Sequence, residues 1–134
     1  MALPDDSKIF FCLCDDSRTE TDGKVSLMGF LGDRVEVALG ANPAPNVQLG
    51  LSKLVLFLSI TAGDGTFRLR AKLTNPRGEQ LELTPEPVDV LKKATGWANI
   101  AFELSPFIVV LGTYTLEFSL DDGTYRRSFE MAGK

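Results

Sequence analysis

Residues 112–131 carry the strongest structural signal in the chain and read Gly-Thr-Tyr-Thr-Leu-Glu-Phe-Ser-Leu-Asp-Asp-Gly-Thr-Tyr-Arg-Arg-Ser-Phe-Glu-Met. Apolar and polar side chains alternate from Tyr114 to Leu120, which is the period-two pattern of a half-buried strand. The pair Asp122-Gly123 supplies the residues that a tight hairpin with positive φ angles favours. Because the alternation resumes beyond this pair, the stretch predicts two antiparallel strands.

Shorter strand patterns recur along the rest of the chain. Strands are expected at residues 9–13, 24–30, 34–39, 53–60, 66–74, 80–84 and 97–104. Gly, Pro and Asp fill most of the connections, and two prolines at 40–50 argue against a regular strand there. Such a succession predicts an all-β fold, an antiparallel β-sandwich of immunoglobulin-like or fibronectin-like topology, with a jelly roll as the alternative.

Residues 85–96 are the one stretch that favours a helix. Pro87 suits a first helical position, and Gly96 suits the position just past a helix end. The segment has room for at most one short helix, near residues 87–95.

The composition predicts one ordinary globular domain spanning residues 1–134. The chain is 44% hydrophobic and 24% charged, and a domain of this size buries roughly two-thirds of its unfolded surface. A net charge of −4 argues against nucleic acid as a partner. The absence of histidine excludes Ser-His-Asp and Cys-His catalysis, and histidine-metal centres, within a single chain.

The lack of a recognisable targeting signal and the cysteine usage predict a cytoplasmic protein without a membrane partner. Residues 1–8 lack the basic start and apolar run of a secretory signal, and no segment reaches the roughly twenty apolar residues of a membrane span. Cys12 and Cys14 would lie roughly 6.5–7 Å apart at Cα in a strand, which disfavours a disulfide. We expect buried thiols in a reducing compartment; a redox or metal pair is the alternative, without a second pair to complete a zinc site.

Aspartates gather in the expected turns, at Asp15-Asp16, Asp64 and Asp121-Asp122. Loops of a sandwich can collect the six to eight oxygens that calcium requires. Aspartate is also a preferred turn residue, and the chain has no Asp-x-Asp-x-Asp-Gly run. We therefore assign no metal and no cofactor, and keep a calcium-dependent small-ligand or carbohydrate-binding module as the alternative function.

Basic residues on two strands raise separate questions. Arg68, Arg70 and Lys72 share one face of a predicted strand and are expected to pair with glutamates across a solvated surface. Arg127 instead falls on the apolar face of the last strand. Either a bulge shifts the register there, or the guanidinium reaches past the sheet edge.

Two stretches contain more apolar residues than a two-sheet sandwich needs. Residues 53–60 are apolar on both faces, so Val55 and Phe57 would point away from the core unless residues 40–50 or 85–96 cover them. Residues 106–111 are apolar where a loop is expected. The candidate interface residues are therefore Val55, Phe57, Phe107, Ile108, Val109 and Val110.

No motif in the chain predicts an enzyme. Glu103 with Glu117, or Asp15 with Asp16, offers carboxylates without a spacing that demands catalysis. A Gly-x-Ser-x-Gly elbow, a phosphate-binding loop and a dinucleotide fingerprint are all missing. We expect no catalytic residue, and a protein-interaction or assembly module that self-associates as a homo-oligomer.

The block at residues 10–30 contains Cys14-Asp15-Asp16 and then Gly23-Lys24-Val25-Ser26-Leu27-Met28-Gly29. This block resembles the start of a group of small, uncharacterised bacterial proteins that form a domain of unknown function. The resemblance covers the rest of the chain loosely. It implies a bacterial β-sandwich without an established activity, so it transfers no catalytic residue.

Overall fold

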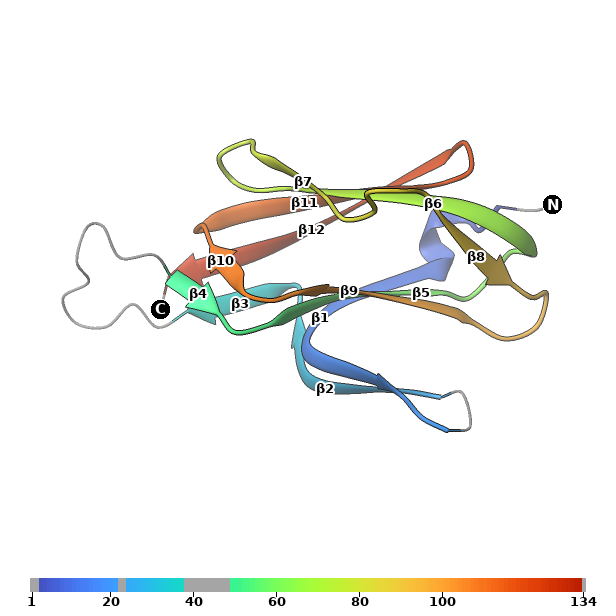
Figure 1. The fold of residues 1–134 in the computed structure, drawn as a ribbon, viewed down its shortest axis with the longest axis horizontal. Helices are drawn as coiled ribbons and strands as arrows, with labels where there is room; N and C mark the ends of the chain where they lie inside the picture. Colours follow the sequence, from blue (N-terminus) through green and yellow to red (C-terminus); the bar gives the residue numbers. More distant parts are fainter. Residues whose placement is uncertain (1–2, 22–23, 38–48, 134) are drawn as a thin grey trace.

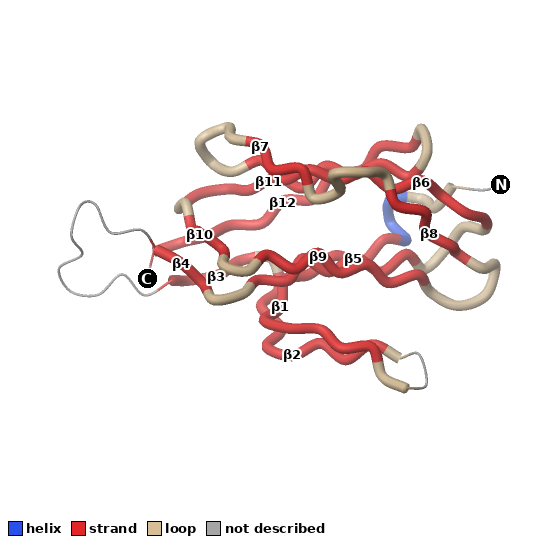
Figure 2. The backbone as a smooth tube through the Cα atoms, in the orientation of Figure 1, coloured by secondary structure: helices blue, strands red, loops and turns tan. Residues whose placement is uncertain are grey.

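The computed structural model describes residues 3–21, 24–37 and 49–133, and these are almost entirely strands (Figures 1 and 2). In chain order the elements are the 3-10 turn η1 (Asp6–Lys8), β1 (Ile9–Thr19), β2 (Val25–Gly32), β3 (Arg34–Val37), β4 (Leu49–Leu51), β5 (Leu54–Ile60), β6 (Gly65–Thr74), β7 (Gln80–Glu82), β8 (Val88–Lys92), β9 (Ala98–Leu104), β10 (Phe107–Val109), β11 (Gly112–Leu120) and β12 (Gly123–Gly133). Most of the predicted 40–50 connection lies outside these ranges, and β4 occupies its end.

Two sheets face each other in Figure 1 and confirm the all-β sandwich. The four-stranded sheet has the order β2-β1-β5-β9. The six-stranded sheet has the order β3-β12-β11-β6-β7, with β8 also pairing with β6, and β10 forms a separate small ladder with β4. All pairings are antiparallel except that of β3 with β12, which is parallel.

The closing hairpin forms as its alternation predicts, with a different turn. Tyr114, Leu116, Phe118 and Leu120 are buried between the sheets. The last pair of the ladder is Leu120 with Gly123, so the turn is Asp121-Asp122, and Asp121 takes the positive φ of 54°. Asp121 tolerates this conformation because its backbone N–H donates to Arg68 O, while its Oδ1 accepts the Arg68 N–H.

Tyr114 joins the core to the connection before its own strand. Its ring stacks on Phe129, with centroids 4.9 Å apart and an interplanar angle of 6°. Its hydroxyl oxygen accepts the backbone N–H of Val110 at 2.9 Å. A tyrosine that bonds the backbone a few residues upstream at this corner is a hallmark of immunoglobulin-like sandwiches.

Residues 87–95, where the sequence left room for at most one short helix, contain a strand instead. Residues 88–92 form β8, which pairs antiparallel with residues 65–69 of β6. Val88 and Val90 favour a strand, and the segment is too short for a helix to gain from cooperativity. Lys92 is buried at the end of β8, where its ammonium donates to Gly63 O and Lys93 O.

Arg127 lies on the inward-facing side of β12. No bulge shifts the strand there, because Arg127 pairs with Leu116 in an unbroken register. Its guanidinium reaches the end of the sandwich, where it donates to Asp6 Oδ1 and Asp6 O at 2.8 Å and to Ile9 O at 3.0 Å. The unbroken register excludes the bulge, and the guanidinium instead bonds the chain at the end of the opposite sheet. The arginine fastens η1 and the start of β1 to the opposite sheet.

The expected pairing with a glutamate is found for Lys72, whereas Arg68 pairs with an aspartate. Lys72 and Arg126 both approach Glu117, at 3.9 and 3.1 Å, and Arg68 approaches Asp89 at 3.7 Å.

None of the helical segments in the ranges that the structure describes is long and apolar enough to cross a membrane.

We predict that Tyr114→Phe lowers the free energy of unfolding by about 1–2 kcal/mol, because the Val110 N–H loses its acceptor in a half-buried corner. Urea unfolding measures the change. The exposed Thr113→Val on the same strand serves as the control and should stay within about 0.5 kcal/mol of the wild type. Equal effects of the two substitutions would contradict the role of this hydrogen bond.

Candidate functional site

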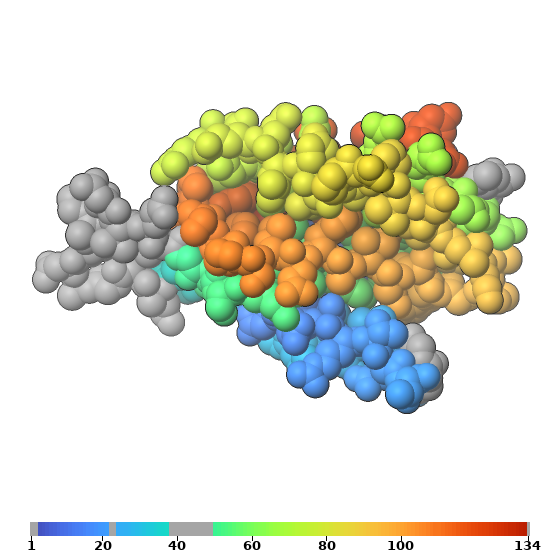
Figure 3. All heavy atoms as spheres, in the orientation of Figure 1, coloured from blue at the N-terminus to red at the C-terminus, as the bar shows by residue number. Residues whose placement is uncertain are grey.

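Strand β9 forms an edge of the four-stranded sheet. It pairs with β5 along its whole length, from Ala98 opposite Ile60 to Leu104 opposite Leu54, without a register shift. Within the described part of the chain, no strand pairs with its other side. On the face seen in Figure 3, the gold-to-orange atoms of this region lie uncovered between β8 and the β1–β2 hairpin. Its outward N–H and C=O groups are therefore open to a partner strand.

The other edges of the two large sheets carry features that discourage pairing. Strand β3 presents Arg34 and Glu36, and β7 is only three residues long. Strand β8 directly follows Pro87, and β2 is distorted at Gly29, which has a φ of 66°. Strand β9 contains no Pro, Gly, Lys or Arg, and Glu103 is its one charged residue. By the usual criteria β9 is the least protected edge of those described.

The two faces of β9 differ. Ile100, Phe102 and Leu104 are partly buried and pack against the main core. Asn99, Ala101 and Glu103 are exposed on the outer face. Asn99 Oδ1 accepts the Ser59 hydroxyl at 2.7 Å, and Glu103 lies 3.5 Å from the Lys53 ammonium.

The β1–β2 hairpin covers the outer face of β5 as a third layer (Figure 1). The register of β1 shifts between Leu13 and Cys14, and beyond that point β1 continues its pairing with β2. Val55 and Phe57 are only 1% and 5% exposed beneath this layer. The expected exposure of these two residues is therefore wrong. Their cover comes from a hairpin that sequence periodicity could not place.

A groove remains between this hairpin and the start of β9, with a volume of about 640 Å³. We call it the hairpin groove, and its lining residues are Phe10, Lys24, Val25, Leu27, Phe57, Ser59, Thr61, Trp97 and Asn99. Phe10 is 47% exposed and Trp97 is 71% exposed. Large apolar side chains left in water beside an open strand indicate a binding surface.

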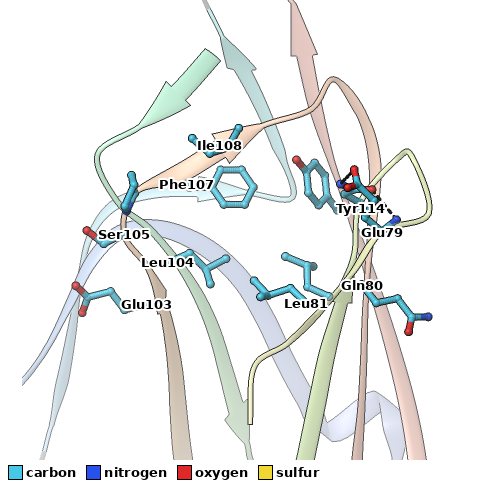
Figure 4. Close-up of a pocket in the computed structure, with 12 residues that line it drawn as sticks. Glu79, Gln80, Leu81, Glu103, Leu104, Ser105, Phe107, Ile108 and Tyr114 are labelled. Carbon is cyan, nitrogen blue, oxygen red and sulfur yellow. Dashed lines mark hydrogen bonds between the residues drawn. The ribbon is translucent and has the colours of Figure 1, made fainter. Parts of the chain in front are cut away.

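A second hollow, the edge cleft, adjoins the end of β9 (Figure 4). It has a volume of about 370 Å³. The rings of Phe107 and Tyr114, 5.5 Å apart, line its apolar part. Glu103 and Glu79 lie on opposite sides of it in Figure 4. A third hollow of about 530 Å³ lies between β8 and residues 97–100, so hollows flank both ends of β9.

The predicted interface at 106–111 divides between core and surface. Residues 107–109 form β10, paired with β4, so their side chains alternate between the two environments. Phe107 and Val109 are buried in the main core, which contradicts their expected exposure. Ile108 is 49% exposed, and Val110 is half-buried. Only Ile108 of the six candidates offers a large exposed surface.

Two of the acidic residues named as metal candidates, Asp16 and Asp121, have other contacts. Asp16 Oδ1 lies 2.9 Å from the Lys53 ammonium, whose hydrogen bond lowers the pKa of this carboxyl, while Asp16 raises the pKa of Lys53. Asp121 serves the turn described above. Among the residues that the structure places, no three His, Cys, Asp or Glu side chains form a group that could hold a metal ion.

Cys12 and Cys14 are free, buried thiols on the face of β1 that the hairpin covers. Burial, and then the neighbouring Cys14, raise the pKa of Cys12 to about 11. Burial is also the main reason that the pKa of Cys14 is raised. Thiols held in this way are poor nucleophiles near neutral pH.

Sequence comparisons add no assignment: no model of a known family matches the chain, and no curated protein matches it either. The resemblance of residues 10–30 to an uncharacterised bacterial group therefore stays an expectation.

We predict that Phe57→Ala lowers the free energy of unfolding by about 3–5 kcal/mol, because it leaves a cavity beneath the hairpin. Chemical denaturation measures the change. Phe30→Ala is the matched control, since Phe30 lies in the same hairpin layer but is 62% exposed. A loss for Phe57→Ala no larger than for Phe30→Ala would show that the hairpin does not cover this face in solution.

We predict that Lys53→Met raises the pKa of Asp16, because the ammonium stabilises the charged carboxylate. Carboxyl NMR titration measures this pKa. A folded-state pKa below the unfolded value means that the pair stabilises the protein above the unfolded pKa, and that this contribution is lost as the pH falls through the folded pKa. Arg18→Met is the control and should have a smaller effect, since Arg18 lies 3.9 Å from Asp16. An unchanged pKa in Lys53→Met would refute the contact.

Proposed function

We propose that this protein is a non-enzymatic protein-interaction module that binds an extended segment along β9. The observation that carries this proposal is the unprotected edge of β9, which no strand in the described ranges pairs with and which runs for seven residues in continuous register with β5. An extended segment that joins such an edge gains main-chain hydrogen bonds without a conformational change in the sheet.

The surroundings of β9 support a protein segment as the ligand. In strand addition, main-chain bonds supply affinity, and pockets for alternate side chains supply specificity. The hairpin groove offers Phe10, Leu27 and Trp97 near the start of β9. The edge cleft offers Leu81 and Phe107 near its end. Apolar side chains of a bound segment would fill these two hollows.

The two thiols support a cellular compartment for this interaction. Cys12 and Cys14 lie in the same buried layer and are both unpaired. Unpaired cysteines are typical of proteins that work in a reducing compartment. We therefore place the interaction in the cytoplasm.

A photoreactive benzoylphenylalanine at position 101 of β9 tests this function in the cells that make the protein. Ala101 is exposed on the outer face of the edge strand, so we expect irradiation to attach a bound segment there. The same group at Ser128, exposed on β12, is the control and should give no adduct. Mass spectrometry identifies the attached peptide. Adducts of equal yield at both positions, or none at 101, would overturn the proposed site.

A further inference from the structure

We propose that the segment bound at β9 is the β9 strand of a second copy of this chain, paired antiparallel about a two-fold axis at Ala101. This inference rests on the proposed function and names its partner. The dimer would join the two four-stranded sheets into one continuous sheet. The register and charges of β9, and the exposed Trp97 beside it, favour this partner.

Two-fold symmetry restricts the register. Residues directly opposite each other in an antiparallel pair share a face of the sheet, so the axis passes through a residue position. An axis at Ala101 pairs all seven residues of the strand, with Ala98 opposite Leu104 of the second copy. Ile100 then faces Phe102, which extends the core-facing side of both sheets. The small Ala101 faces its own copy at the centre.

Charge and the number of paired residues favour this register over axes at Glu103 and at Asn99. With the axis at Ala101, Glu103 faces Asn99 of the second copy. Asn99 Oδ1 accepts the Ser59 hydroxyl, so the donors of its amide group are what it offers to that carboxylate. An axis at Glu103 would instead place two carboxylates directly opposite each other, which is destabilising. An axis at Asn99 would leave residues 101–104 of the strand unpaired.

The dimer would also cover the most exposed aromatic residue near the strand. Trp97 directly precedes β9 and is 71% exposed. In the proposed register it lies opposite Ser105 of the second copy, one residue from Pro106 and beside the edge cleft. An aromatic side chain that an interface covers is a typical source of binding energy. Two-fold symmetry would provide this contact twice.

Sedimentation velocity over a concentration series tests the inference on the whole chain. We expect the wild type to dimerise at micromolar to millimolar concentration. The emission of Trp97, which is the chain's single tryptophan, should shift to the blue as the dimer forms. Ala101→Lys and Ala101→Glu should each raise the dimer dissociation constant by roughly tenfold or more, since each places like charges opposite each other at the axis.

A mixture of the two variants tests whether position 101 of one copy faces position 101 of the other. An equimolar mixture of Ala101→Lys and Ala101→Glu should recover the dimer, because the opposite charges then meet. Ser128→Lys adds the same charge on exposed β12 and should leave the dimer unchanged. Circular dichroism checks that each variant stays folded.

A wild type that stays monomeric throughout the series would overturn the inference. So would a dimer that Ala101→Lys leaves intact, or a mixture that does not recover it. Failure here is separable from failure of the proposed function. If the photoreactive group at position 101 captures a different protein while the chain is monomeric, strand addition at β9 stands and the second copy is excluded.

Discussion

The burial of β5 on both of its faces is the constraint on which the rest of the structure depends. All seven residues of β5 are buried, so this strand needs a cover on each side. The six-stranded sheet covers the face that carries Leu54, Leu56 and Leu58. The β1–β2 hairpin covers the face that carries Val55 and Phe57 (Figure 1). A two-layer sandwich thus becomes three layers over part of its area, and the hairpin groove lies where the third layer leaves β9 uncovered.

Local periodicity predicted the strands well, but it did not predict which elements pack against the faces of those strands. The alternation from Tyr114 to Leu120 is a property of adjacent residues, and the structure buries those side chains as expected. The fate of Phe57 depends instead on a register shift at residues 13 and 14, some forty positions away in sequence. The prediction of an exposed interface at residues 106–111 was wrong at Phe107 and Val109 for a related reason. Its apolar excess serves a short strand with one buried face, and that strand needs β4 as a partner.

Sequence patterns did not identify the β9 edge as a candidate site. Whether a strand lies at an edge depends on the order of strands in the sheet, and not on the residues of the strand alone. The alternation of Ile100, Phe102 and Leu104 predicted a strand at residues 97–104, and that strand formed. Nothing in that alternation shows whether a strand has one neighbour or two. One local signal was available: the strand contains a single charge and no proline, and it directly follows an exposed tryptophan. Residues 87–95, the one stretch where the sequence left room for a short helix, show the same limit, since pairing with β6 outweighs the helix-end signals of Pro87 and Gly96.

The contrast between the two edges of the smaller sheet explains why strand addition at β9 would end in a closed assembly. An open sheet with two accessible edges can add strands without limit. The opposite edge is β2, where Gly29 has a φ of 66° and packs so closely on Asp15 that a Cβ there would lie 2.2 Å from Asp15 Oδ2. This distortion interrupts the flat ladder that a further strand requires. Pairing about a two-fold axis uses the remaining edge of each copy once, so the sheet stops growing at two.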